Sequence, residues 1–373
     1  MTSKWLIFVA ITICLCMSNV VVIGRKVRSK DVIKTIKTEY GVYDCVDFYK
    51  QPALKDPRLK NHSFHPEMRP LARPNLVKSN DISDGLSIMD MKFKGETCPR
   101  GTVPIRRLNA DDERRQIEIR RQSYAQLGQP RTDGWSASDI KFALGQSKSD
   151  STKVYNGIAS TLSIFNPHVE RYQYSSGEII IKSGSDAIIT GWTVNPMLYK
   201  DNLTHFFIYT VSGDSHCMGV TCGFIPVRED IPLDFIFDFI STVEGTKFNY
   251  PFFVYQDALN GNWWLEIGDD NTILGFWPQN FFHGLYKSAS YVACGGEVYG
   301  PQQSLVYMGS GYKPVANKPE WSYCKDVKVV NEAQYVVLDT DLEPFMSNWR
   351  HYIAVVHDTG KKHYVVYGGP EAY

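Results

Sequence analysis

One acidic residue, Glu297, is the first candidate for chemistry in this sequence. It is the single carboxylate in residues 291–301, which read YVACGGEVYGP. The two glycines before it allow the backbone to lie close to a neighbouring chain, and the aromatic, strand-like surroundings keep water away. Such a carboxylate is suited to act as an acid or a base, provided that a second polar group lies beside it.

Other hydrolytic and redox mechanisms lack their motifs. The sequence contains no GxSxG, HExxH or CxxC pattern and no phosphate-binding glycine loop. His216 beside Cys217 suggests a metal ligand, but no second histidine is nearby, so a disulfide is favoured at Cys217. We predict no metal site and no cofactor. What remains is hydrolysis by carboxyl groups, which needs one ionised group to activate water and one protonated group to serve the leaving group.

Aromatic residues could form a groove beside Glu297. We expect Trp192, Trp264 and Trp277 to line this groove and to contact substrate. The alternative is that these tryptophans belong to the hydrophobic core of the fold.

Residues 1–24 have the pattern of a secretory signal peptide. Lys4 precedes an apolar run that ends near Met17, and small or polar residues follow it. A membrane anchor is the alternative, but the run is close to the lower limit for spanning a bilayer. We expect a secreted protein, extracellular or in the cell wall, with no membrane contact after removal of the signal. Asn61 (NHS) and Asn202 (NLT) are candidate glycosylation sites there.

Six cysteines remain after the signal peptide, and an even number in a secreted chain predicts disulfides. Cys45 and Cys98 are the only pair in the amino-terminal half, and a bridge between them would stabilise a small domain with a limited core. Cys217 and Cys222 enclose only the residues MGVT, so a bridge there would fix a tight turn.

Charge divides the chain into two regions. Residues 25–131 contain 23 Lys and Arg against 14 Asp and Glu, whereas residues 132–373 contain 16 against 26. Opposite net charges favour docking of the first region on the second, and an acidic partner outside the chain is the alternative. The basic region has no nucleic-acid-binding motif, so we expect no nucleic-acid partner. We divide the chain into a signal peptide (1–24), an amino-terminal domain (25–129), a linker (130–138) and a second domain (139–373).

Local patterns predict mainly β-structure. Four prolines exclude a long helix from residues 56–74, but a helix is expected after Asn109, with acidic residues at its start and arginines at its end. Its arginine doublets are alternatively processing sites. Beyond residue 138, short β-branched and aromatic runs separated by Gly, Asn and Asp predict an all-β domain, an antiparallel sandwich or barrel. One further helix is expected at 278–290.

Linked motifs along the whole chain resemble the neprosin family of plant secreted proteins. In the second domain they are GWTVNPMLYKD, FIYTVSGDSHCMGVTCGFI, LNGNWWLEIGDDNTILGFWP, ACGGEVYGP and YMGSGY. In the amino-terminal domain, YDCVDFYKQPALKDPRLKNH and CPRGTVPIRR resemble the activation peptide of that family. The resemblance covers residues 33–369. It implies a β-sandwich catalytic domain, a removable prodomain over 25–129, and a glutamic-type endopeptidase that prefers to cleave beside proline.

The resemblance also implies a defect. Glu297 falls on one of two catalytic glutamates of the family, and the other lies two positions before a GW pair, in an E-A-G-W pattern. Here that pattern reads ITGW and begins at Ile189. Because isoleucine can neither activate water nor donate a proton, we expect a weakened peptidase.

A neighbouring acid, Glu178, is a candidate replacement. If the strands on either side of Gly184 form a hairpin, Ile180 pairs with Ile189 and Glu178 pairs with Gly191. Strand periodicity then places Glu178 and Ile189 on one face of the sheet, one diagonal step apart. A shift of one residue would instead turn Glu178 to the opposite face.

Cys294 and Cys324 also depart from the family pattern. The family usually has an aromatic residue at position 294, and it closes its carboxyl end with a cysteine bridge whose members are absent here. Compared with the family, these two cysteines look like a compensating pair, and we expect a disulfide between them.

Two functions follow from these observations. The first is a secreted zymogen of a glutamic-type peptidase, weakened at Ile189, whose partners are its own prodomain and a peptide substrate. In it, acid would loosen the docked prodomain as carboxylates become protonated. The second is an inactive extracellular module that binds proline-rich peptides or cell-wall polysaccharide. The retained GGEV motif favours the first and Ile189 favours the second.

Overall fold

The computed structural model describes residues 27–76, 96–128, 138–148, 152–314, 321–338, 341–359 and 363–371. The signal peptide expected at 1–24 lies outside these residues, as does the linker expected at 130–138 except for its last residue. No helix in the described ranges is long and apolar enough to cross a membrane.

The amino-terminal region forms a small antiparallel sheet and several single turns of 3₁₀ helix. Its strands, in order across the sheet, are β1 (Val32–Thr38), β2 (Gly41–Asp47) and β4 (Thr102–Arg106). The turns are η1 (Ser29–Asp31), η2 (Phe48–Lys50), η3 (Ala53–Lys55) and η4 (Pro57–Leu59). A disulfide between Cys45 and Cys98 joins β2 to the segment before β4. The prolines of this region limit it to short turns, as the sequence indicates.

The helix expected after Asn109 is present as α2 (Ala110–Tyr124). The Asn109 side chain caps it by accepting hydrogen bonds from the backbone N–H groups of Asp111 and Asp112. Acidic residues occupy its first turn and Arg121 its last, which complements the helix dipole.

From residue 140 onward the chain forms two sheets that pack face to face. Across the first sheet the order is β10 (Ser215–Met218), β9 (Thr204–Ser212), β8 (Asp186–Val194), β7 (Tyr174–Ser183), β15 (Tyr291–Tyr299), β5 (Ile140–Ser147) and β18 (Leu342–Met346). Across the second it is β11 (Ile225–Pro226), β14 (Thr272–Trp277), β13 (Trp263–Ile267), β12 (Asn249–Gln256), β6 (Gly157–Ser163), β16 (Ser322–Val330), β17 (Tyr335–Leu338) and β3 (Asn75–Leu76). A hairpin of β19 (Ile353–Asp358) and β20 (His363–Gly368) pairs with β16 through β20.

This arrangement confirms the predicted all-β, antiparallel sandwich. The strand pairs are antiparallel except β17 with β3, where the amino-terminal region adds a parallel edge strand. The core between the sheets is apolar, and buried tryptophans join its two sides: Trp192 Nε1 of the first sheet donates to the carbonyl oxygen of Ser163 at 2.9 Å. Trp277 Nε1 of the second donates to Thr210 Oγ1 at 2.8 Å.

The β7–β8 hairpin has the register predicted from the sequence. Ile180 lies opposite Ile189 and Glu178 opposite Gly191. The loop is shorter than the four residues expected, because Ser183 and Asp186 also pair. Gly184 occupies this turn with φ of 58°, a conformation that favours glycine.

The helix expected at 278–290 is wrong. The segment contains only a single turn, η5 (Gln279–Phe281), and then runs irregularly into β15. The buried Asp186 carboxylate accepts hydrogen bonds from the backbone N–H groups of His283, Gly284 and Leu285. A tertiary contact thus takes the donors that a helix would have used. Two other short elements are α3 (Pro196–Tyr199) and η6 (Pro301–Gln303).

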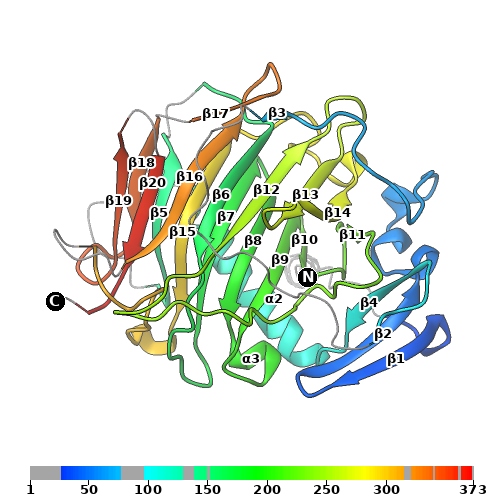
Figure 1. Cartoon of the computed structure of the whole chain (residues 1–373), viewed down its shortest axis with the longest axis horizontal. Coiled ribbons are helices and arrows are strands. Elements are labelled where there is room, and N and C mark those ends of the chain that lie inside the picture. The colour runs from blue at the N-terminus through cyan, green and yellow to red at the C-terminus, as the bar shows by residue number, and fades with distance from the viewer. Residues whose placement is uncertain are drawn as a thin grey trace, which may run out of the picture.

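The amino-terminal region covers parts of both outer faces of the sandwich (Figure 1). Helix α2 passes behind β7, β8 and β9 in that view, and its Ile117 and Ile119 belong to an apolar cluster with Ile180 and Phe207 of the first sheet. The blue segment before β3 extends over the outer face of β12, β13 and β14 and reaches β17.

Candidate active site

Glu297 lies at the centre of the first sheet. On β15 it pairs with Phe142 of β5 and with Ser176 of β7. Gly295, two residues earlier, has φ of 150°, and a Cβ atom there would lie 2.3 Å from the carbonyl oxygen of Ala143. Only glycine therefore allows β15 to approach β5 this closely, which is the role expected of the glycines before Glu297.

Glu178 lies on the same face as Glu297. It pairs with Gly295, two residues from Glu297 along β15, so the two carboxyl groups are diagonal neighbours. Both side chains are fully buried. Arg120 Nη1 lies within 3.0 Å of an oxygen of each, so the two carboxyl groups face the same space. Ile189 shares this face but packs in the apolar cluster under α2.

Arg120 of α2 binds both carboxyl groups. Its Nη1 lies 2.9 Å from Glu178 Oε2 and 3.0 Å from Glu297 Oε2. Nη2 donates to Ser176 Oγ at 2.9 Å, and the guanidinium lies 4.6 Å from the ring centre of Phe207. Ser123, one turn further along α2, donates to Glu297 Oε2 at 2.8 Å. The arginine thus occupies the space between the acids, and α2 closes it from solvent.

Polar residues that no motif indicated surround the two acids. Tyr174 donates a short hydrogen bond to Glu297 Oε1, and Ser176 Oγ donates to Thr193 Oγ1 at 2.9 Å. Tyr174, Ser176 and Glu178 alternate along β7, so they share one face. That period-two spacing was the signal available once Glu178 had been singled out.

Burial and neighbouring charges shift the pKa values of the groups in this cluster. Burial, reinforced by the negative charge of Glu297, raises the pKa of Glu178 to about 8, although Arg120 opposes this. Burial and then Glu297 also raise the pKa of Tyr174 well above its ordinary value, so its hydroxyl remains a donor. Burial alone would lower the pKa of Arg120, but the charge of Glu297 and its other neighbours raise it, so the guanidinium stays charged.

The cluster has the components for acid–base chemistry. Burial and the charge of Glu297 favour the protonated form of Glu178, while Glu297 accepts hydrogen bonds from Tyr174, Ser123 and Arg120. A proton donor and a proton acceptor side by side are what hydrolysis by carboxyl groups requires. In this closed form the arginine takes the place that water and substrate would need.

The expected tryptophan groove is not present. Trp192 and Trp277 are fully buried between the sheets, and Trp192 lies on the face of β8 opposite to Glu297. Trp264 is also fully buried, on the second sheet beside Phe276, which is covered by Phe64 of the amino-terminal region. The strand registers direct these side chains away from the acids, and this depends on the pairing of distant strands.

The cysteines agree only partly with expectation. The structure contains disulfides between Cys45 and Cys98 and between Cys217 and Cys222. The bridge expected between Cys294 and Cys324 is not formed, and both are buried free thiols. They belong to opposite sheets, and burial together with the neighbouring Cys294 raises the pKa of Cys324 well above its ordinary value. A disulfide would require the two cysteines to be neighbours, and they are, but both remain thiols.

The remaining candidate positions lie at the surface. Asn61 and Asn202 are both exposed and lie outside strands and helices, so a glycan at either would meet no packed neighbour. Among the residues that the structure describes, no group of three or more His, Cys, Asp or Glu side chains is placed to hold a metal ion.

Solved structures of two peptidases are similar to parts of this chain. One is scytalido-glutamic peptidase with a peptide-based transition-state analogue: the TM-score is 0.35 at 10% identity, over 62% of this chain and 98% of that one. The other is SCP-B, a member of the eqolisin family of peptidases, in complex with the tripeptide Ala-Ile-His: the TM-score is 0.34 at 9% identity, over 63% and 98%. Likeness at this level assigns no role to any residue of this chain.

Family models give a more definite result. The model of the neprosin activation peptide matches residues 35–146, and it includes α2 with Arg120. The neprosin model matches residues 171–370, which contain Glu178 and Glu297. Since this second match alone covers more than half of the sequence, the chain belongs to the neprosin family.

Proposed function

We propose that this protein is the secreted zymogen of a glutamic-type endopeptidase whose catalytic acids are Glu178 and Glu297. The observation that carries the proposal is the pair of buried carboxyl groups on one sheet face, which share a single guanidinium from Arg120. A peptidase precursor must keep its acids from water and substrate, and α2 does so here. The prodomain is residues 25–129, and a signal peptide and glycans at Asn61 and Asn202 belong to the same proposal.

The proposed roles rest on what the sheet itself supplies without α2: Tyr174 donates to Glu297, and the charge of Glu297 favours the proton on Glu178. Once α2 has left, ionised Glu297, oriented by Tyr174, takes a proton from a water molecule. The water oxygen then attacks the carbonyl carbon of the scissile peptide bond while protonated Glu178 donates to the carbonyl oxygen. Collapse of the tetrahedral intermediate breaks the C–N bond, and the proton held by Glu297 passes to the leaving nitrogen. The proton of the carbonyl oxygen returns to Glu178, so the pair ends as it began.

Glu178 also changes the expectation for Ile189. A weakened site was expected because isoleucine stands where the family resemblance places the first acid. The register of β7 and β8 brings Glu178 to the diagonal position beside Glu297, while Ile189 packs among apolar side chains. We therefore propose a complete pair of acids rather than a crippled one.

We propose that tyrosines, and not the expected tryptophans, contact the substrate. Tyr299 stacks on Tyr174 with 5.7 Å between ring centres, and with Tyr172 it lines a surface hollow along α2. Departure of α2 would join this hollow to the acids. Proline rings dock well on aromatic faces, which supports a preference for peptides that contain proline.

The experiment compares the full chain with variants of each acid after acidification. Glu297→Gln and Glu178→Gln should each lower the rate of cleavage of proline-containing peptides by about 100-fold or more. Glu343→Gln, the same change on β18 outside the carboxyl pair, is the matched control and should leave the rate unchanged. Cleavage sites are read by mass spectrometry.

Two results would contradict the proposal. Full activity of Glu178→Gln would remove Glu178 from the pair and restore the idea of a site weakened at Ile189. Equal traces of activity in the wild type and Glu297→Gln would favour the alternative, an inactive module that binds proline-rich peptides or polysaccharide. The pairing of Glu178 with Gly295, which brings it beside Glu297, supports the peptidase over that alternative.

A further inference from the structure

Another buried glutamate, apart from the carboxyl pair, lies on the opposite side of the molecule. Glu266 of β13 is on the outer face of the second sheet, where it is 2% exposed. Tyr255 donates to its Oε1 at 2.5 Å, and Phe253 lies directly opposite it on β12. A carboxylate on an aromatic surface is costly unless a cation accompanies it.

Arg73 of the prodomain supplies that cation. Its Nε and Nη2 lie 2.9 and 2.7 Å from Glu266 Oε2, so the guanidinium binds the carboxylate through two nitrogens. Nη2 also donates to Asn271 Oδ1 at 3.0 Å, and the guanidinium lies 5.5 Å from the ring centre of Phe253. The planar fork of arginine fits this arrangement, whereas a lysine could not reproduce it.

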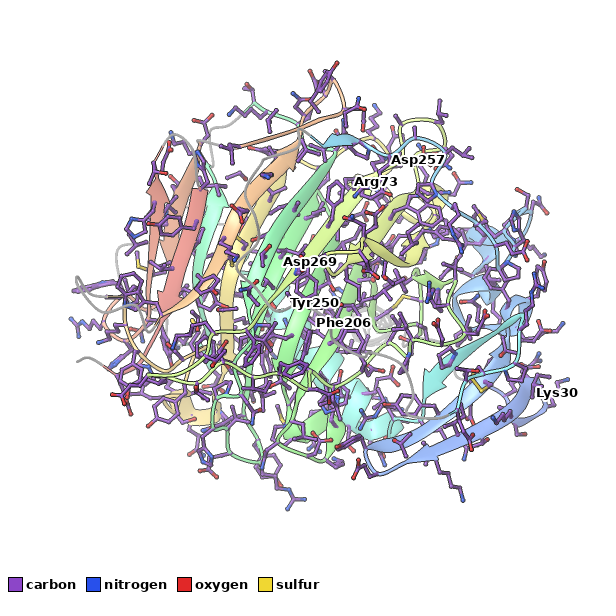
Figure 2. All side chains as sticks on the ribbon, in the orientation of Figure 1. Lys30, Arg73, Phe206, Tyr250, Asp257 and Asp269 are labelled. Atoms are coloured by element: carbon purple, nitrogen blue, oxygen red, sulfur yellow. A yellow bond between two sulfur atoms is a disulfide. The ribbon has the colours of Figure 1, made fainter. Side chains whose placement is uncertain are left out.

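The same site also binds the main chain before and after Arg73. The Asp257 carboxylate accepts hydrogen bonds from the backbone N–H groups of Leu71 at 2.6 Å and Ala72 at 3.2 Å. Beyond Arg73 the chain pairs with the edge of the sheet as β3, where the N–H of Asn75 donates to the carbonyl oxygen of Gln334 at 3.1 Å. Figure 2 shows Arg73 and Asp257 close together beside β12 and β13.

These contacts recognise features that are not special to the prodomain. They require two consecutive free amide groups, an arginine directly after them, and an extended stretch that can join an edge strand. Addition of a strand to an exposed edge is a common way of binding peptides. The groups that do the binding, Asp257, Glu266 and the edge of β17, all belong to the second domain.

We propose that this surface becomes a second peptide-binding site, distinct from the carboxyl pair, when the prodomain leaves. Its ligand is an extended segment of a polypeptide substrate that contains arginine, and in the zymogen residues 71–76 occupy it. The inference rests on the proposed function, because the site opens only if the prodomain is removed. It would hold a long substrate away from the acids and so select polypeptides that carry arginine.

The test uses the full chain and a fluorescent peptide with the sequence of residues 69–76, RPLARPNL. Arg73→Glu places like charges opposite Glu266 and should displace the chain's own segment. The peptide should then bind Arg73→Glu, by fluorescence anisotropy, at least about tenfold more tightly than the wild type. Adding Glu266→Gln should weaken binding by about 10- to 100-fold, and a peptide with glutamine in place of its second arginine should lose a similar factor.

Controls separate this site from the active site. Binding should be the same when Glu297→Gln is added, because the peptide does not contact the carboxyl pair; loss of binding there would place the peptide at the active site and overturn the proposal. The proposal also fails if Arg73→Glu binds no better than the wild type or if Glu266→Gln has no effect. Should circular dichroism show that Arg73→Glu is unfolded, Arg73→Ala gives the same comparison.

Discussion

The amino-terminal region contacts both outer faces of the sandwich through an arginine that binds a glutamate, and a tyrosine of the sandwich donates to the same glutamate. On the first sheet Arg120 binds Glu297, which accepts a hydrogen bond from Tyr174. On the second sheet Arg73 binds Glu266, which accepts one from Tyr255 in the same way. In both places a buried carboxylate is neutralised by an arginine and held by a tyrosine.

The difference between the two faces is a second acid. Glu178 lies beside Glu297, and burial together with that neighbouring charge raises its pKa to about 8. On the second sheet Glu266 instead binds Arg73 through two nitrogens, in the geometry of a simple ion pair. One buried acid thus suits the binding of a cation, whereas two adjacent acids, one of which has a raised pKa, suit proton transfer.

Loss of the contact between Arg120 and the two acids should have the largest effect on stability. Arg120→Ala leaves two buried carboxyl groups without their cation and should lower the free energy of unfolding by about 3–5 kcal/mol. Urea denaturation at neutral pH measures this. Arg115→Ala, on the exposed side of the same helix, is the control and should change the stability by less than about 0.5 kcal/mol. Equal effects of the two changes would mean that Arg120 is not the anchor.

The pH dependence of unfolding should identify Glu178. Its pKa is higher in the folded chain, about 8, than its ordinary value of 4.5, so the folded form binds the proton more tightly. Stability from this group is therefore complete below about pH 4.5 and is lost as the pH rises through about 8. Each unit of such a shift is worth about 1.4 kcal/mol. Glu178→Gln should flatten the dependence between pH 5 and 8, and an unchanged slope would contradict the shift.

Loss of the contact between Arg73 and Glu266 should lower the free energy of unfolding by less. Arg73→Ala removes a charged hydrogen-bonded pair at a partly exposed arginine, and we expect a loss of about 1–3 kcal/mol in the same denaturation experiment. Arg69→Ala, four residues earlier and exposed, serves as its control. A cost for Arg73→Ala as large as that for Arg120→Ala would erase the distinction between the two faces.

The smallest expected effect concerns Asp201, near Arg106 of the prodomain. Burial raises the pKa of Asp201, but the hydrogen bond and charge of His205 and the charge of Arg106 outweigh it and hold the pKa below its ordinary value. Stability from this group is therefore present above about pH 4 and is lost as the pH falls further.

Acid should accordingly loosen the prodomain through Asp201 only below about pH 4, whereas Glu178 strengthens the closed form on the way down. Limited proteolysis over a pH series follows the opening. Asp201→Asn should open at higher pH than the wild type, with a stability loss of about 1 kcal/mol or less at neutral pH. Opening that begins near pH 6 in the wild type would instead point to another titrating group.

Local sequence patterns were enough for much of the fold. The strand-rich second domain, the capped helix after Asn109 and the register of the β7–β8 hairpin all follow from spacing and turn residues, because neighbouring residues decide them. The helix expected at 278–290 failed because Asp186, distant in sequence, binds the backbone N–H groups of that segment. The groove of tryptophans is absent because Trp192 and Trp277 point between the sheets, away from Glu297, and only the pairing of distant strands decides which face is inside.

For the site, strand periodicity and the glycines before it were enough to single out Glu297, and they offered Glu178 as a neighbour only if one hairpin had the right register. The strand pairing of the folded chain fixes that register and places Glu178 beside Glu297. Only the tertiary structure decided that Arg120 fills the space between the two acids and that Arg73 fills the matching place on the other sheet. These pairings join residues far apart in the chain. They arise from burial and charge neutralisation, which no local pattern records.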